Sequence, residues 1–468
     1  MQQDEHRTIV DGVDFGSVFR FPSIFGAVAS SMQPSRMIVG LLMVVLLLIG
    51  GNIWDAFAGP VVSPQGLAGG RYGGMDATQR LVISKAASAF GGTNDQTQDS
   101  WTAAEAQRHL VGRWSKVVHS GEAAAGDEEI YNTMYASLED IRPLGVFEAA
   151  AMWLNDAFLG VVESATRFDP AGMWRGVVAI AWELPRALFN NGFHWFISIY
   201  GFVMLFVLGI GGGAIARMQA AQHARGTRLS AGDALVAAWR HWREIVLAVI
   251  APAMVIVVLA IVLMIFGLVL LNIPVISMLG GILYGAALLV GLLIAVLAVG
   301  YSVCWPLLVP AVVVEHCDGG EAVQRSYAYL VSRPLHLLGY ATVAVVGLVL
   351  GFLVVRIVAT STLDLTADLV GTWTFGDVLR DAGSSTVGAA PPPGLAWYEA
   401  SAGWFVGLWE TLLRDTMIGW SFSGFFSVSA MIYLLMRRAC DGQDTREIWW
   451  PGLIPGTLVP EEDGVRHS

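Results

Sequence analysis

The sequence predicts an all-α integral membrane protein with about six transmembrane helices in three pseudo-repeated hairpins, inner-face amphipathic helices and a helical outward insertion. Of its 468 residues, 55% are hydrophobic and only 14% charged, whereas soluble domains carry about 25% charged residues. The apolar residues also gather in runs, most of which approach or exceed the roughly 20 residues that cross a hydrocarbon core. Because the backbone in lipid must satisfy its own hydrogen bonds, each run is expected to be a helix.

Six apolar runs are the predicted spans. They are Met37–Ile53, Phe193–Ala216, Ile245–Leu271, Gly281–Val303, Leu335–Ile357 and Ile418–Met436. The first is short unless it extends to Gly59, and the last is rich in serine. We expect no cleavable signal peptide, because the segment before the first run is too long and no clear cleavage site follows the run. The first run is therefore expected to be an uncleaved anchor.

These runs divide the chain into seven expected parts. They are an amphipathic segment at 1–36, a first span at 37–59, an insertion at 60–191, spans two to five at 192–361, a loop with an interfacial helix at 362–416, a sixth span at 417–438 and a tail at 439–468. The interfacial helix is predicted from the apolar residues Trp404, Phe405, Leu408, Leu412 and Leu413.

The insertion is the largest part outside the predicted spans. Helical spacing of apolar residues predicts helices at Asp76–Phe90, Thr102–Val118, Val146–Arg167 and Met173–Phe189. Glu122–Glu129 is expected to form an acidic loop. The last two helices could form a soluble core or lie along the membrane surface, and their tryptophans favour the membrane surface.

Arginines near the span ends predict the threading. Arg20 and Arg36 precede the first span. Those that follow the second and sixth spans are Arg217, Arg225, Arg228, Arg240, Arg243, Arg437 and Arg438. Lysine and arginine accumulate in cytoplasmic loops. The pattern therefore predicts a multi-pass protein of the bacterial inner (cytoplasmic) membrane with both termini in the cytoplasm and residues 60–191 and 362–416 facing outward.

A repeated unit is predicted in the second half of the chain. Gly232–Leu235 aligns with Gly320–Val323 at an offset of 88 residues (320 minus 232). In both copies the apolar residues mark one face of a surface helix that runs into a span. Chance similarity between apolar segments is the alternative explanation.

No catalytic, cofactor-binding or metal-binding residue is predicted, and no cofactor. His241 and Glu244 could place two metal ligands on one helix face, but further ligands are missing, so a solvated helix is favoured. The contiguous Glu315–Asp318 is favoured as a turn, because chelating side chains usually need spacing to converge. His194 is interpreted as a polar anchor at the interface. The three cysteines form no zinc or disulfide pattern.

Several transport and enzyme classes lack support in the sequence. The spans are almost free of ionisable residues, which argues against a proton-coupled pump and weakens a transporter of hydrophilic substrates. Pro306 and Pro310 are expected to mark where the fourth span leaves the bilayer. We find no phosphate-binding P-loop, no HExxH and no GxSxG motif. The formal net charge of −11 gives no reason to expect nucleic acid.

The segment VVVEHCDGGEAVQRSYAYLVSRPLHLLGY, from Val312 to Tyr340, resembles a signature of bacterial polytopic membrane proteins. These include the membrane domain attached to some glycerophosphodiester phosphodiesterases. The shared pattern is an apolar span, an acid, a Gly-acid-Ala helix start, a serine such as Ser326 and another span. The phosphodiesterase's catalytic domain is not found in this sequence, so the resemblance implies fold and location and not catalysis.

The favoured function is a non-enzymatic accessory or scaffold protein. Its expected partners are membrane lipid and other membrane proteins or further copies of itself. The alternative is a permease or transporter for a hydrophobic or amphipathic, lipid-like substrate. A cavity lined by Ser421, Ser423, Ser427, Ser429 and His336 would favour the permease, and a tightly packed bundle would oppose it.

Overall fold

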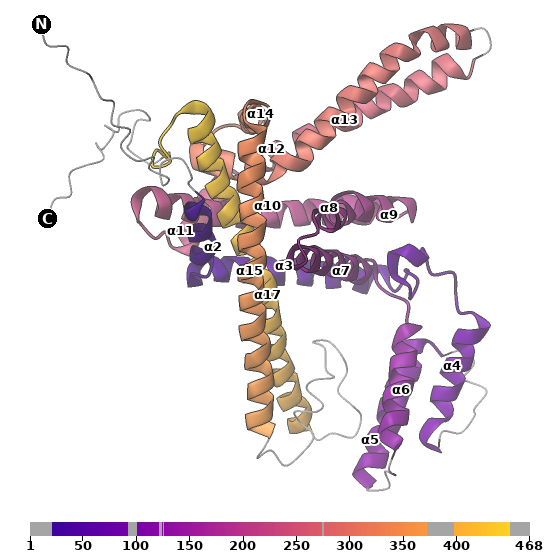
Figure 1. The fold of residues 1–468 in the computed structure, drawn as a ribbon. Coiled ribbons are helices and arrows are strands. Elements are labelled where there is room, and N and C mark those ends of the chain that lie inside the picture. The colour runs from indigo at the N-terminus through magenta and orange to yellow at the C-terminus, as the bar shows by residue number, and fades with distance from the viewer. Residues whose placement is uncertain are drawn as a thin grey trace, which may run out of the picture. The chain divides into compact units, whose positions relative to one another are not determined.

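A computed structural model of the chain describes residues 21–91, 101–120, 124, 126–273, 276–371 and 397–449 (Figure 1). These residues form helices, with two isolated β-bridges from Val62 to Arg71 and to Leu144 and no strand among them. The all-α prediction is confirmed. The first residues of the predicted amphipathic segment, most of the loop after residue 371 and the tail beyond 449 lie outside the described residues.

Six helical segments are long and apolar enough to cross a membrane. They are Pro34–Ala58, Phe196–Arg225, Trp242–Leu271, Ser277–Glu315, Pro334–Val370 and Ser401–Asp441. Each overlaps one of the six predicted runs, so the prediction of a multi-pass membrane protein with six spans is confirmed.

Three of these helices are much longer than a bilayer crossing requires. α13 (Ile276–Glu315) has 40 residues, α15 (Pro334–Gly371) has 38 and α17 (Trp397–Asp441) has 45, whereas about 20 residues cross the hydrocarbon core. The predicted outer loop therefore begins as helix, because α15 continues to Gly371. The predicted interfacial helix is not separate from the sixth span, since α17 is continuous from Trp397.

The two prolines of α13 do not end the helix. Pro306 and Pro310 lie inside α13, which continues to Glu315. A proline removes one helical hydrogen bond, and helix packing can support such an interruption in a membrane helix. That packing is present, because every residue from Leu307 to Val314 is buried.

The chain divides into two compact units built from separate segments. The described residues of Met1–Gly40, Leu208–Gly351 and Trp420–Ser468 form unit 1, and those of Leu41–Val207 and Phe352–Gly419 form unit 2. The described segments also contain short 3₁₀ and π turns, namely η1 (Gly66–Gly69), η2 (Ala89–Gly91), η4 (Ala179–Glu183), η5 (Phe196–Tyr200) and η6 (Gly267–Leu271).

Short helices lead into membrane helices in unit 1. α2 (Pro22–Ser30) precedes α3 (Pro34–Ala58), α11 (Ala231–Arg240) precedes α12 (Trp242–Phe266), and α14 (Gly319–Ser332) precedes α15.

α11 and α14 begin in the same way. Ser230 Oγ accepts a hydrogen bond from the backbone of Asp233 at 3.1 Å, and Asp318 Oδ1 accepts one from Glu321 at 2.7 Å. Such N-caps satisfy otherwise unpaired backbone donors. The cap residues are again 88 positions apart (318 minus 230), in the register that the sequence comparison predicts.

Small residues allow close helix packing in unit 1. At Gly212 of α10 (Gly201–Arg225), a Cβ atom would lie only 2.3 Å from the ring of Phe426 in α17. At Gly351 of α15, a Cβ atom would lie 2.6 Å from the ring of the buried Trp420. Glycine therefore lets α10, α15 and α17 approach one another closely.

A three-helix group in unit 2 contains a helix that the sequence analysis missed. α4 (Ala77–Ser88), α5 (Ala103–Ser120) and α6 (Asp127–Asp140) pack around Leu110 and Leu138 (Figure 1). The predicted acidic loop overlaps the first turn of α6, where its acidic residues lie. Acidic residues stabilise a helix N-terminus through the helix dipole, so these acids belong to a helix start.

Unit 2 also contains α7 (Val146–Thr166), α8 (Pro170–Val178) and α9 (Leu184–Asn190), together with parts of the longer helices α3, α10, α15 and α17. Asp55, near the end of α3, accepts hydrogen bonds from the backbone of Phe147 and Glu148, each at 2.9 Å. A carboxylate at a helix N-terminus is favourable. The end of the first span therefore positions the start of α7.

Candidate functional site

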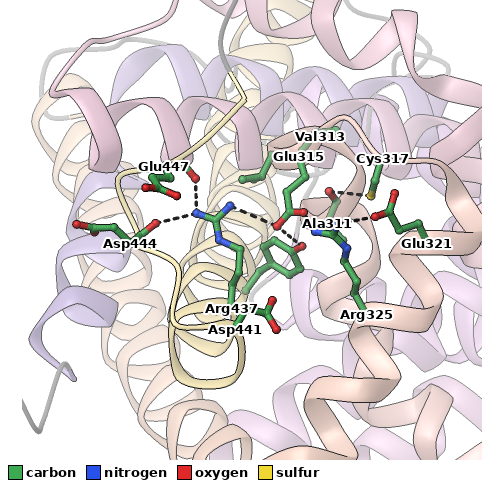
Figure 2. A network of polar contacts seen from close by, with 12 residues as sticks. Ala311, Val313, Glu315, Cys317, Glu321, Arg325, Arg437, Asp441, Asp444 and Glu447 are labelled. Carbon is green, nitrogen blue, oxygen red and sulfur yellow. Dashed lines mark hydrogen bonds and ion pairs between the residues drawn. The ribbon is translucent and has the colours of Figure 1, made fainter. Parts of the chain in front are cut away.

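A network of polar contacts in unit 1 surrounds the end of α13. Glu315 lies between Arg325 of α14 and Arg437 of α17 and forms an ion pair with each (Figure 2). Tyr433 Oη donates to Glu315 Oε1 at 2.7 Å, and Arg437 Nη1 lies 3.3 Å from the same oxygen. We call Glu315, Arg325, Tyr433 and Arg437 the polar junction. It ties three helices together.

Arg437 also holds the chain that follows α17. Its Nη2 atom donates to the backbone oxygens of Asp444, at 2.9 Å, and of Glu447 (Figure 2). The Arg437 side chain is only 3% exposed. Because a buried cation is costly without partners, this set of acceptors positions both the side chain and the segment that bends back around it. We call residues 442–449 the C-terminal arm.

The end of the C-terminal arm lies against the end of α13. The backbone nitrogen of Trp449 donates to Val314 O at 3.1 Å. Arg217 of α10 donates to Trp449 O at 2.7 Å and to Val313 O at 3.2 Å. One arginine therefore bridges α10, α13 and the arm through carbonyl oxygens.

His316 completes the contact with the arm. Its φ angle is +57°, which is uncommon for a residue other than glycine. Its ring stacks on Trp449 with centroids 3.8 Å apart and lies 4.2 Å from the ring of His241. Burial, the nearby His241 and Arg217 lower the pKa of His316 to about 3. His316 therefore packs as a neutral aromatic ring at neutral pH.

His241 and Glu244 serve separate contacts. His241 Nδ1 lies 3.0 Å from Ala237 O, in hydrogen-bonding geometry, and Glu244 Oε2 accepts a hydrogen bond from the backbone of Gly319 at 2.9 Å. Glu244 thus stabilises the start of α14, while His241 packs on His316. The structure does not bring the two side chains to a common metal position.

The Glu315–Asp318 segment is the turn between α13 and α14, and its side chains point to different partners. Cys317 Sγ donates to Ala311 O at 3.4 Å, and Asp318 caps α14. Burial is the main cause that raises the pKa of Cys317 to about 12, so this thiol stays protonated and is a poor nucleophile. Among the described residues, no three His, Cys, Asp or Glu side chains are placed to hold a metal ion.

A second polar cluster surrounds Arg36 at the start of α3. Arg36 is 1% exposed. Its Nη1 donates to Ser30 Oγ at 2.8 Å and to Gln219 Oε1 at 2.5 Å, and its Nη2 donates to Gln222 Oε1 at 2.5 Å. All of these acceptors are neutral. They belong to α2 and α10, so Arg36 ties the first span to the second.

From the sequence alone, Arg36, Arg217 and Arg437 were interpreted only as charges near span ends. The structure buries all three among helices of unit 1. Gln219 and Gln222 could have indicated a polar contact site, because two glutamines three residues apart share a helix face and need hydrogen-bond partners when they are buried. The identity of the partners depends on helix packing and could not be read from the sequence.

The residues expected to line a permease cavity differ in their exposure. Ser423, Ser427 and Ser429 are buried, and Ser423 Oγ donates to Ser31 O at 2.8 Å. His336, by contrast, is exposed. The predicted interface residue His194 is also exposed, with its ring 4.5 Å from that of Phe189.

The polar contacts described above connect helices of unit 1 to one another and to the C-terminal arm. Comparison of the chain with protein-family models, with curated proteins and with solved structures found no match.

Proposed function

We propose that the protein is a non-enzymatic accessory or scaffold protein of a bacterial inner membrane, which packs against lipid and other membrane proteins or further copies of itself. One observation carries the proposal. α12 and α13 lie side by side as an apolar hairpin (Figure 1), and no residue in the most apolar 18-residue stretch of either helix is buried. A long apolar surface of this kind is available for packing within a membrane.

Several polar side chains of unit 1 support this proposal because they form hydrogen bonds to other groups of the same unit. Arg437 bonds to Glu315 and to the C-terminal arm, Arg36 bonds to the glutamines of α10, and Glu244 caps α14. The contacts of Glu244 and Glu315 fix one end of α12 and of α13 against α14 and α17. Preorganised surfaces bind with a lower entropic cost than mobile ones, as a scaffold requires.

The proposed threading places both termini in the cytoplasm. Arg228, Arg240 and Arg243 are exposed beside α11 and the start of α12, where a cytoplasmic location agrees with the usual bias of positive charge. We also propose that α11–α12 and α14–α15 are pseudo-repeated units, supported by their equivalent N-caps. Kinship with the membrane domain of glycerophosphodiester phosphodiesterases is part of the same proposal and implies no catalysis.

The test is purification of the full chain in mild detergent or nanodiscs, followed by mass spectrometry of the retained proteins and lipids. We expect a stoichiometric protein partner or a defined homo-oligomer. The informative variant is Gly281→Leu with Gly285→Leu, because a Cβ atom added at either position of α13 would have open space around it. The variant should fold normally and lose the association.

Gly339→Leu is the matched control, because Gly339 also has open space around it and lies in α15, outside the hairpin. It should retain the partner. A selectively enriched lipid or small molecule without any protein partner would favour the permease instead. A monomer that retains neither would contradict both functions.

A further inference from the structure

The helical segment that precedes the second span has two apolar faces. From Pro170 to Asn190, α8, η4 and α9 follow one another without a break. One face packs against α7, since a Cβ atom at Gly172 would lie 2.4 Å from Ser164 and one at Gly176 would lie 2.4 Å from Val161. These distances show that α8 packs closely on α7.

The opposite face carries large apolar side chains that contact little of the chain. They are Trp174, Val177, Trp182 and Phe189, which we call the aromatic row, and Trp182 is 65% exposed. The steps along the row are three, five and seven residues. The five-residue step falls across the π turn η4, in which hydrogen bonds join residues five apart, so the row stays on one side.

Two further exposed aromatic residues flank this segment in the sequence. Phe168, at the turn between α7 and α8, is 85% exposed at a φ angle of +54°, a conformation that is unfavourable for a bulky residue. Trp195, immediately before the second span, is 76% exposed. Large exposed apolar patches are rare on soluble monomers and mark interaction sites, so this row of exposed rings is expected to be covered.

We propose that the aromatic row lies in the headgroup region of the bilayer, so that α8–α9 is an interfacial membrane anchor. Continuity with the membrane span identifies lipid as the occupant. Only residues 191–195 separate α9 from the span beginning at Phe196, whose Ile199 and Phe202 are exposed apolar residues. Tryptophan is enriched where membrane meets water, and amphipathic helices with tryptophan, phenylalanine and arginine lie in that plane.

The charged residues of the segment fit the same position. Arg175, Glu183 and Arg186 are exposed, and Asp169, immediately before α8, lies 3.6 Å from Arg175. Arginine can keep its charge in water while its stem follows apolar surface. If the aromatic rings insert into the bilayer and these charged groups stay at the headgroups, each kind of side chain lies in a favourable environment.

A photocrosslinking amino acid, p-benzoylphenylalanine, tests the proposal in the full chain. It replaces Trp182 or Phe189, ring for ring, in chains reconstituted into nanodiscs of phosphatidylethanolamine and phosphatidylglycerol. Phe202, on the span, calibrates the lipid reaction, and Asn155, exposed on α7, is the aqueous control. Illumination should attach lipid at positions 182, 189 and 202 but not at 155, and mass spectrometry would detect these lipid adducts.

Lipid adducts at 202 but not at 182 or 189 would overturn the proposal. Crosslinks from 182 and 189 to a protein in native membranes would also overturn it, because the face would then bind a protein partner. Two labelled sites keep the test valid if one substitution impairs folding, which gel filtration would reveal. The result is independent of the accessory function, because the nanodiscs contain no other cellular protein.

Discussion

The polar junction and the α12–α13 hairpin belong to one compact unit and share one continuous helix, yet they differ in how side chains are used. The final turns of α13 are buried, and Glu315 at its end holds two arginines. The earlier turns of the same helix expose nearly every large apolar residue. The difference shows that in this protein apolar side chains provide surface, whereas buried polar groups and glycines determine which helices meet.

Removing the central carboxylate should give the largest effect. Glu315→Ala leaves Arg437 buried without its ion-pair partner and removes the acceptor of Tyr433. Breaking a buried pair costs about 3–5 kcal/mol, and chemical or thermal denaturation in one detergent would measure it. Glu321→Ala is the control, because Glu321 is partly exposed and such pairs contribute about 1 kcal/mol or less. Equal losses in both variants would contradict a special role for the junction.

A charge on the hairpin should have the next largest effect. Ile261 is exposed within α12, and Ile261→Arg should reduce insertion of the span by about 2.5–3.5 kcal/mol if its surroundings are lipid. A glycosylation reporter on the loop after α12 would measure insertion, with Ile261→Leu as the control. Unchanged insertion would show that this side of α12 faces a polar environment instead.

Glycines should separate the two regions directly. Gly212→Val places a methyl-bearing carbon against the buried Phe426 ring, and overpacking of this kind costs about 1–3 kcal/mol. At Gly285 in the hairpin an added Cβ atom would have open space around it, so Gly285→Val should leave the unfolding midpoint unchanged for an isolated chain. A reversed order of the two midpoints would mean that the hairpin, and not the bundle near the junction, limits stability.

Acidification from pH 7 to pH 5 should weaken attachment of the C-terminal arm by about 2 kcal/mol at most. The pKa of His316 is lowered to about 3 in the folded chain, and an exposed histidine has a pKa of about 6.5. When the arm is released, His316 is exposed and binds a proton below about pH 6.5, whereas it stays neutral while the arm is attached. Attachment therefore weakens as the pH falls, and the effect levels off near pH 3. Each pH unit in that range corresponds to about 1.4 kcal/mol at most.

Hydrogen exchange of the arm, corrected for intrinsic rates, would follow this release from pH 7 to pH 5. His316→Phe keeps an aromatic ring against Trp449 and removes the titrating group, so its exchange should not change over that range. A wild-type arm with pH-independent opening would show that His316 is not coupled to arm attachment.

Local sequence patterns were sufficient for the membrane helices and for several helices of the insertion. The spans follow from apolar length alone, because lipid leaves the backbone no other partner. α6 was missed because its acids were interpreted as loop residues, although acids also begin helices. Pro306 and Pro310 were expected to mark where the fourth span leaves the bilayer, and the structure places both inside α13, whose surrounding turns are buried.

By itself, the sequence determined that the chain is helical, that it crosses a membrane and where its spans lie, because these properties depend on composition within one segment. Only the tertiary structure decided that Arg36 meets the glutamines of α10, that Glu315 meets Arg437, and that His316 stacks on Trp449. Such pairs join residues more than a hundred positions apart, and their formation depends on the close approach that residues such as Gly212 permit. A local pattern contains no information about which distant surface will satisfy a buried polar group, since that requires the packing of all helices together.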